Sequence, residues 1–256
     1  MSERLNADEI ERYARHIVLS DIGGTGQQAL KNACVLVVGA GGLGSPVLQY
    51  LAAAGVGLLG IADDDAVSLS NLQRQVIHDT NSIGQPKTAS AASMIAHLNP
   101  HVRTRCHDIR LTVDNAASVL EGYDVVVDGS DNSETRYVLA DAAEALKITL
   151  VTGAVSRFDG SVTVLQPWKT NGDGKRNPRY RDLFPAPPPP GLLPSCAQAG
   201  VIGALTGVIG TLQAMEVIKV ITGAGEPLIG RLLLYDGLAA RFTTIQYNRR
   251  DVPEID

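Results

Sequence analysis

The stretch VLVVGAGGLG, residues 35–44, decides the fold of this chain. Its first half is a short apolar run rich in β-branched residues, and its second half is rich in glycine and leads into a helical pattern. Such a stretch predicts a buried strand that turns directly into a helix, and the N-terminus of a helix attracts phosphate. We therefore expect a nucleotide site at this turn.

The glycines match the pattern G-x-G-x-x-G at Gly39, Gly41 and Gly44. The first permits a tight turn, the second lets the backbone approach phosphate oxygens, and the third lets the helix pack against the sheet. The pattern alone also occurs in turns that bind nothing. Here Asp63 ends the next expected strand, which completes the context of a nucleotide fingerprint.

The residues beyond the glycines bear on which nucleotide binds. An NAD site needs one acid for the ribose and little fixed positive charge. This chain adds Asp65, the run SNLQRQ at 70–75 with Arg74, and Lys87. A triphosphate needs such cations, and Mg²⁺, to stabilise its departing pyrophosphate. The sequence thus favours ATP, and an NAD-dependent oxidoreductase is the alternative that the glycines alone suggest.

Alternating strands and helices predict a parallel sheet that is covered on both faces. The expected strands lie at 34–38, 58–62, 102–107, 125–128 and 149–153, after helices at 7–18 and 27–32. Beyond them we expect a strand at 161–166, a helix at 200–222 and strands at 231–235 and 241–246. The fold class is therefore α/β, a Rossmann-like, doubly wound, mostly parallel sheet with an antiparallel C-terminal extension and N-terminal helices.

Composition sets limits on the function classes. A chain of 256 residues with 45% hydrophobic content favours a single domain over 1–256, and the net charge of −5 argues against general nucleic-acid binding. The longest apolar segment, 199–221, contains Gln213, Glu216 and Lys219, so it predicts a buried helix and no membrane span. Three widely spaced cysteines form no disulfide framework, which predicts a reducing cytoplasm.

Two further segments carry chemistry. Asp131 and Asn132 follow the strand at 125–128, so they point to the same crevice as Asp63. Asp131 is alternatively the N-cap of a helix expected over 132–146. Six prolines between residues 185 and 194 predict a stiff extended segment, and Cys196 follows it. That thiol is either an activated nucleophile or a small buried residue.

Taken together, these motifs resemble the MoeB/ThiF/HesA group, relatives of the ubiquitin-activating enzymes, and particularly its MoeB branch. The resemblance spans nearly the whole chain. It rests on the glycines, the D-x-D of Asp63 and Asp65, and on RYARHIVL (12–19), SLSNLQRQ (68–75), GQPK (84–87), GSDN (129–132), RFDG (157–160) and GVIGTLQAMEVIK (207–219).

The resemblance implies an ATP-dependent adenylyltransferase. Its partner would be a ubiquitin-like sulfur-carrier protein ending in Gly-Gly, whose C-terminal glycine it activates as an acyl-adenylate for molybdopterin or thiamine-type biosynthesis. The implied catalytic residues are Arg15 of the neighbouring subunit in a homodimer, Arg74, Lys87, Asp131 and Cys196. The implied nucleotide-binding residues are Gly39, Gly41, Gly42, Gly44, Asp63, Asp65, Ser70, Asn71, Leu72, Gln73, Arg74, Gln75, Lys87, Asp131 and Asn132, with Asp131 also holding Mg²⁺. The loop at 166–195 would cross over the tail of the carrier.

One departure concerns zinc. Many members of the group hold zinc with two C-x-x-C pairs, but here Arg179 and Asp182 stand at the first pair and residues 249–256 contain no cysteine. The five histidines are scattered, so we expect no zinc site. Without the metal, the sequence leaves open whether the loop at 166–194 is ordered.

Other functions stay open within the resemblance. One is a relative that docks a carrier or tRNA without forming a thioester, and another is a relative that activates modified tRNA, which the low basic content disfavours. No rhodanese-like segment follows Asp256, so we expect the sulfur donor to be a separate protein.

Overall fold

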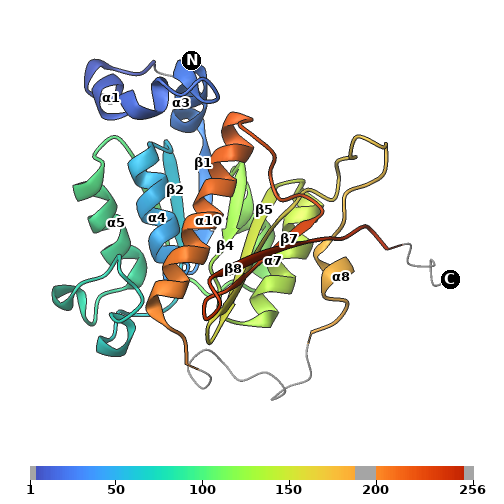
Figure 1. Cartoon of the computed structure of the whole chain (residues 1–256). Coiled ribbons are helices and arrows are strands. Elements are labelled where there is room, and N and C mark those ends of the chain that lie inside the picture. Colours follow the sequence, from blue (N-terminus) through green and yellow to red (C-terminus); the bar gives the residue numbers. More distant parts are fainter. Residues whose placement is uncertain (1–3, 188–199, 251–256) are drawn as a thin grey trace.

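The computed structural model describes residues 4–187 and 200–250, and an eight-stranded sheet runs through its centre (Figure 1). The strand order is β3-β2-β1-β4-β5-β6-β7-β8. The strands are β1 Cys34–Val38, β2 Leu58–Ala62, β3 Arg103–His107, β4 Val125–Asp128, β5 Thr149–Ser156, β6 Asp159–Leu165, β7 Arg231–Asp236 and β8 Arg241–Gln246. The first five strands pair in parallel and the pairs from β5 to β8 are antiparallel, which confirms the expected fold class.

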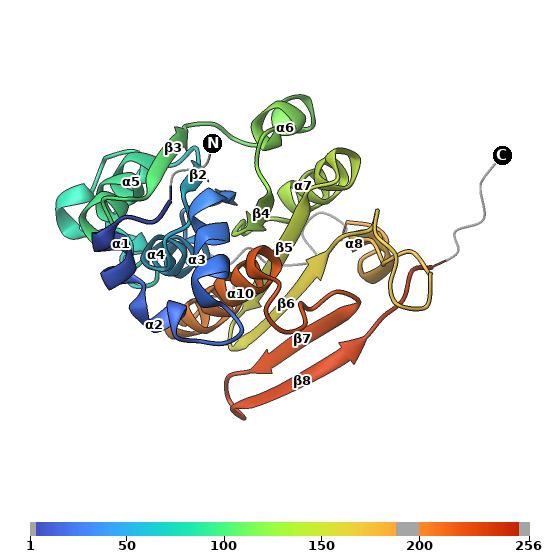
Figure 2. The ribbon, with the colours of Figure 1, turned by 90° about the horizontal axis from the view of Figure 1, so that it is seen from above.

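Helices cover both faces of the parallel part. Seen from above, α6 and α7 lie on one side of the sheet, and α3, α4 and α10 lie on the other (Figure 2). The helices are α1 Ala7–Arg12, α2 Ala14–Ile17, α3 Gly23–Asn32, α4 Gly44–Ala54, α5 Lys87–Leu98, α6 Val113–Leu120, α7 Ser133–Leu146, α8 Tyr180–Leu183 and α10 Gly203–Thr222, with 3₁₀ turns η1 Leu69–Asn71 and η2 Thr80–Ser82.

Strand β1 divides the apolar core in two. Its alternate side chains point to opposite faces, so Val35 and Val37 pack with α4 and α10, while Leu36 and Val38 pack with α6 and α7. All four are at least 95% buried, which explains the unbroken apolar run at this point of the sequence. A strand buried on both faces is therefore the rigid base from which the glycine turn leaves.

Some element boundaries differ from the expectation. The helix expected over 7–18 is interrupted at Tyr13, whose hydroxyl accepts a hydrogen bond from Asn99 Nδ2 at 2.8 Å. Tyr13 is buried against Gly55, so a tertiary contact outweighs the local helical pattern there. Strand β5 continues to Ser156 because it pairs with β6 as far as Asp159.

Helix α10 is the apolar segment noted in the sequence. Among the described residues it is the one helix that is long and apolar enough to cross a membrane. It packs against α3, α4, β5 and β6, and it buries Leu205, Ile209 and Val217 in the core. The prediction of a buried helix is confirmed.

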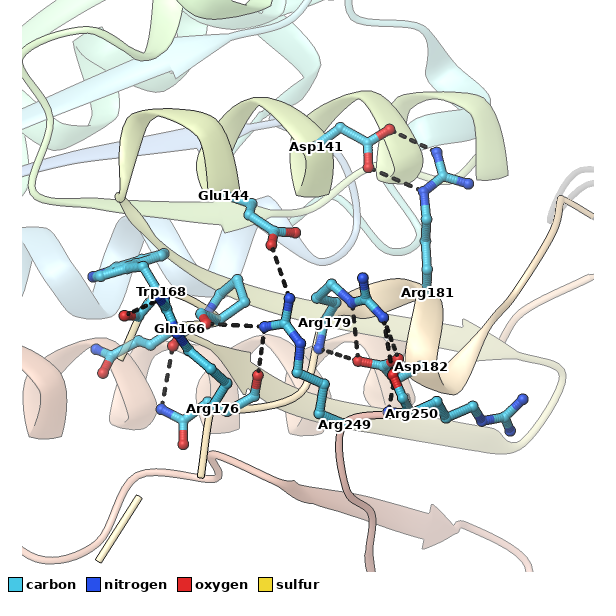
Figure 3. A network of polar contacts seen from close by, with 12 residues as sticks. Asp141, Glu144, Gln166, Trp168, Arg176, Arg179, Arg181, Asp182, Arg249 and Arg250 are labelled. Atoms are coloured by element: carbon cyan, nitrogen blue, oxygen red, sulfur yellow. Dashed lines mark hydrogen bonds and ion pairs between the residues drawn. The ribbon is translucent and has the colours of Figure 1, made fainter. Parts of the chain in front are cut away.

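A network of ion pairs holds the segment that carries α8 (Figure 3). The side chain of Asp182 is 2% exposed, and its Oδ1 accepts hydrogen bonds from Arg179 Nη2 at 3.0 Å and from the Arg250 N–H at 3.1 Å. Its Oδ2 accepts from the Arg179 N–H at 2.7 Å. We call Arg179, Asp182, Arg249 and Arg250 the Asp182 clasp, because they join α8 to the C-terminal segment.

Within the clasp, Arg249 contacts the loop before α8. Its Nη1 donates to the carbonyl oxygens of Pro167 at 3.2 Å and Asn177 at 3.3 Å, and its Nη2 lies 3.9 Å from Glu144 Oε1 on α7 (Figure 3). Charged side chains thus stand at positions 179 and 182, where the family resemblance would place the first C-x-x-C pair. The network contacts this loop at Pro167 and Asn177 and reaches α8 at Asp182. Residues 188–199, with Cys196, lie outside the described residues.

Candidate nucleotide site

The site lies where the sheet changes its winding direction. Strand β1 sits between β2 and β4, its own connection leads to α4 on one face, and β4 leads to α7 on the other face. The carboxyl ends of such neighbouring strands leave a crevice between them. A cavity of about 300 Å³ occupies this place.

Eight segments line the cavity. They are the glycine turn, the end of β2, the run after η1, the start of α5, the residues after β3, the turn after β4 with the start of α7, the end of β5 and the start of α10. The lining residues are Val38, Gly39, Gly41, Gly42, Leu43, Ala62, Asp63, Asp64, Asp65, Arg74, Gln75, Lys87, Ile109, Arg110, Leu111, Gly129, Ser130, Asp131, Asn132, Thr135, Arg136, Val155, Val201 and Thr206.

The three fingerprint glycines have different surroundings. Gly39 has a φ of +92°, and a Cβ there would lie 2.7 Å from the Gly129 carbonyl oxygen. A Cβ on Gly44 would overlap the Gly39 carbonyl oxygen, so both positions require glycine for the fold. A Cβ on Gly41 would meet nothing closer than Gln75 Nε2 at 3.6 Å. Gly41 therefore leaves space on the cavity side, which the backbone packing alone does not require.

The start of α4 presents unpaired donors to this cavity. Within residues 4–187 and 200–250, the N–H groups of Gly41, Gly42 and Leu43 donate to no protein acceptor. These groups stand at the N-terminus of an 11-residue helix, where the helix dipole adds positive potential. Such an arrangement suits an anion.

The acids after β2 are held in a fixed pattern. Asp63 Oδ2 accepts from the Ala40 N–H at 2.8 Å, and its Oδ1 accepts from the Asp65 N–H at 2.9 Å. Burial raises the pKa of Asp63, while the nearby Lys87 opposes that rise. Lys87 Nζ is 2.6 Å from Asp65 Oδ2 and 3.7 Å from Asp63 Oδ1, so a buried cation stands beside the acids.

Asp63, Asp64 and Asp65 also form a potential metal cluster. Their carboxylate oxygens lie within 4.8 Å of one another, and among the described residues this is the one such group of three. Lys87 already neutralises part of its charge. The cluster alone therefore does not identify a metal site.

The run after η1 positions Arg74 and Gln75. Arg74 Nη1 donates to the Ser70 carbonyl at 3.1 Å, and the side chain lines the cavity. Gln75 is buried beside Gly41, and its Oε1 has no hydrogen-bond partner. Ser70, Asn71, Leu72 and Gln73 do not line the cavity. Asn71 instead accepts a bond from the Ser68 N–H at 3.1 Å, which closes the turn that carries Arg74.

The start of α7 separates the two roles considered for Asp131. Asn132 is the N-cap, since its side chain accepts from the Thr135 N–H at 2.9 Å, so the alternative of Asp131 as the cap is wrong. Asp131 is exposed at the cavity, and within the described residues its carboxylate makes no hydrogen bond or ion pair.

Sequence reasoning missed Arg136. Its Nη2 donates to the Ser130 carbonyl at 3.0 Å, its Nε lies 3.7 Å from Asp128 Oδ2 without a hydrogen bond, and the side chain lines the cavity. Its position one turn into α7, after Asn132, was an available signal. Ile109, Arg110 and Leu111 were also missed, although they follow the end of β3 at the same edge of the sheet.

Arg15 lies far from this cavity. It is exposed on α2, two residues after Tyr13, which packs against Gly55 at the C-terminal end of α4. The glycine turn is at the other end of that helix, about 16 Å away along its axis. Arg15 therefore does not line the cavity of its own chain.

Comparison with known proteins places the chain among adenylyltransferases. The model of the ThiF family matches residues 13–253. A Thermus thermophilus protein named sulfur carrier protein adenylyltransferase is 50% identical over 96% of this chain and 90% of its own length. The probable adenylyltransferase/sulfurtransferase MoeZ of Mycobacterium tuberculosis is 48% identical over 94% of this chain, which spans 61% of that protein.

Solved structures share the fold. The crystal structure of E. coli MccB with MccA-N7isoASN superposes with a TM-score of 0.83 at 19% identity, covering 95% of this chain and 74% of the other. At that identity the likeness supports the fold alone.

Proposed function

Because the chain belongs to the ThiF family, we propose that it is an adenylation domain that transfers the adenylyl group of ATP to the C-terminal glycine of a ubiquitin-like sulfur-carrier protein. The observation that carries the proposal is the convergence of unpaired N–H groups of the α4 N-terminus, Arg74, Lys87 and Asp131 on one cavity. Donors, cations and an acid of this kind match a nucleoside triphosphate with its metal.

The reaction would be an in-line displacement at the α-phosphorus. A carboxylate oxygen of the carrier forms a new bond to the α-phosphorus. The bond from the α-phosphorus to the oxygen that bridges it to the β-phosphorus breaks, and pyrophosphate leaves with that electron pair. The carboxylate is already ionised, so no general base is needed. Positioning and neutralisation of charge then supply the rate enhancement.

Each residue has a place in this scheme. The N–H groups of Gly41 and Gly42 bind phosphate oxygens, and Asp63 binds the ribose while it holds the glycine turn. Arg74 and Lys87 stabilise the leaving pyrophosphate, and the pair with Asp65 fixes the Lys87 ammonium at the cavity. Gln75 and Asn132 contribute amide groups to the lining of the same cavity.

Asp131 is the residue that would hold Mg²⁺. Its exposed carboxylate is unpaired within the described residues and faces the cavity, and carboxylate oxygens are the ligands that this hard cation takes. When bound, Mg²⁺ neutralises the charge of the triphosphate.

Arg15 supports a homodimer. Arg15 lies on α2, close to Tyr13, which packs against the C-terminal end of α4, and the cavity of the same chain is at the opposite end of α4. Arg15 can therefore contribute to the triphosphate only in a second copy of the chain. Mixing R15A with D131A tests this: each variant alone is expected to be inactive, and mixed dimers regain partial activity because one of their two sites is intact. Two inactive variants that stay inactive after subunit exchange would contradict the trans role.

The same proposal includes the cellular compartment, the sulfur donor, the pathway and the metal content of the protein. We expect the chain to work in the cytoplasm, with a separate sulfur donor, in molybdopterin or thiamine-type biosynthesis, and with Cys196 as a candidate acceptor of the activated acyl group. No structural zinc is expected, because the Asp182 clasp occupies the corresponding place. Stoichiometric zinc in purified protein would contradict this expectation.

The central test is exchange between ATP and labelled pyrophosphate, with a panel of purified carriers that end in Gly-Gly. We expect exchange only with a carrier whose terminal glycine is present. Asp131→Ala should abolish exchange and leave thermal unfolding unchanged. Glu134→Ala removes a neighbouring exposed acid that does not line the cavity, so it serves as the matched control. Stabilisation by NAD in place of ATP would refute the proposal.

A further inference from the structure

A buried histidine contacts the backbone of the glycine turn. His78 is 6% exposed, and its Nε2 lies 2.9 Å from the Ala40 carbonyl oxygen. Its other ring nitrogen, Nδ1, lies 2.9 Å from the hydroxyl of Ser90, which is buried on α5. Neither side chain lines the cavity, so neither is expected to touch the nucleotide.

The two contacts define how the ring is protonated. A carbonyl oxygen only accepts, so Nε2 carries the hydrogen and donates it to Ala40. In a neutral imidazole Nδ1 is then an acceptor, and it receives the hydroxyl hydrogen of Ser90. Burial lowers the pKa of His78, which favours this neutral form, although the hydrogen bond to the Ala40 carbonyl and the charges of Asp63 and Asp79 oppose the shift. The ring is therefore a fixed donor with a fixed orientation.

The contact at Ala40 has a consequence for the next residue. The Ala40 carbonyl and the Gly41 N–H belong to one planar trans peptide, so they point in opposite directions. With the carbonyl held at His78, the Gly41 N–H points away from it, and Gly41 lines the cavity. On the preceding peptide, the Ala40 N–H is held by Asp63 at 2.8 Å. The turn is thus held on both sides of Ala40.

We propose that His78, oriented by Ser90, is a positioning residue that directs the Gly41 N–H toward a phosphate of the nucleotide. The inference rests on the proposed function, since it assigns a supporting contact to the same phosphate site. It predicts that the effect of His78 on ATP binding depends on a donor at the position of Nε2 and not on the imidazole itself.

Two substitutions separate the ring nitrogens. In His78→Gln the amide nitrogen can reach the position of Nε2 and donate to Ala40, whereas in His78→Asn the shorter side chain reaches the Ser90 side only. We expect H78N to raise the KM for ATP in pyrophosphate exchange about tenfold, close to the lower limit for the loss of one hydrogen bond to a charged group. H78Q should stay within about threefold of the wild type, because the donor is restored. The KM for the carrier should not change in either variant.

Two more variants complete the experiment. Ser90→Ala leaves the ring in place but removes the group that orients it, so a smaller rise in the KM for ATP is expected with intact folding. His97→Asn is the control, because His97 is exposed at the other end of α5 and, among the described residues, its ring makes one hydrogen bond, to the Ser93 carbonyl.

The outcomes distinguish a failure of the positioning role of His78 from a failure of the proposed function. Equal losses in H78N and H78Q, in step with a lower unfolding temperature, would overturn the positioning role and leave the proposed function intact. A wild-type KM for ATP in both H78N and S90A would do the same. Wild-type protein that neither exchanges pyrophosphate nor gains thermal stability from ATP would refute the proposed function instead.

Discussion

The Asp182 clasp and the nucleotide cavity are both rich in charged groups, but they differ in how those groups are satisfied. In the clasp, both oxygens of a buried carboxylate accept hydrogen bonds from Arg179 and Arg250. At the cavity, three N–H groups of the glycine turn, Gln75 Oε1 and Arg136 Nε have no hydrogen-bond partner within the described residues. A satisfied network stabilises a fold, whereas donors and acceptors left unpaired around a cavity are available to a ligand.

The largest expected effect is on the reaction. Arg74→Ala should reduce carrier-dependent pyrophosphate exchange about 10³-fold, since a cation that stabilises a leaving phosphate group contributes on this scale. Thermal unfolding should change little, because within the part of the chain that the structure describes the Arg74 guanidinium makes one hydrogen bond, to the Ser70 carbonyl. Arg176→Ala is the matched control, because among the described residues its guanidinium also makes one hydrogen bond, to the Trp168 carbonyl, and it does not line the cavity. A large loss of stability in R74A would remove the contrast between the two regions.

The next effect is on stability. Asp182→Ala should lower the free energy of unfolding by about 3 kcal/mol, because it leaves the partners of a buried carboxylate unpaired. Exchange activity at low temperature should persist, since the clasp does not line the cavity. Asp141→Ala, which breaks the exposed pair with Arg181 nearby, should cost less than about 1 kcal/mol. Chemical denaturation of the three proteins measures both values, and equal losses would contradict the assignment of the clasp.

A smaller effect distinguishes two glycines of the same turn. Gly41→Ala places a methyl group on the cavity side, so we expect about a tenfold higher KM for ATP and little change in unfolding. Gly44→Ala should instead destabilise the fold, because its Cβ would overlap the Gly39 carbonyl. Calorimetry and exchange kinetics on both variants check this difference. A G41A protein with unchanged affinity for ATP would argue against phosphate binding at Gly41.

The smallest effect is the pH dependence of the clasp. Burial opposes the ionisation of Asp182, but hydrogen bonds from Arg179 and the Arg250 backbone outweigh it and lower its pKa below the ordinary 3.8. A lowered pKa in the folded state adds stability that is fully present above 3.8 and is lost as the pH falls through the folded value. Unfolding of wild type and D182N should therefore differ most near neutral pH and converge in acid. A difference that does not change with pH would contradict this.

Much of the fold followed from the sequence because the signals were local. The apolar run of β1 ends at Gly39, and the helical pattern over 44–54 follows it directly, at the place where α4 forms. The interruption at Tyr13 was not predicted, since it depends on Asn99 and Gly55, which are distant in the sequence. The site residues likewise divide into those that local sequence signals predicted and those that depend on the tertiary structure. Asp63, Arg74, Lys87 and Asp131 were predicted and line the cavity, whereas Arg136 and His78 were missed.

By itself the sequence determined the strand-turn-helix unit at 35–44 and the type of ligand that it suits, because a glycine turn after a buried strand is encoded by adjacent residues. Through its resemblance to the MoeB/ThiF/HesA group, it also indicated that Arg179 and Asp182 stand where many members carry cysteines. Only the tertiary structure decided which groups are already paired. Asn132 caps α7 and leaves Asp131 at the cavity, and Asp182 bonds Arg250 across 68 residues. Hydrogen bonding depends on distances of a few tenths of an ångström between segments remote in the chain, and the packed fold alone sets those distances.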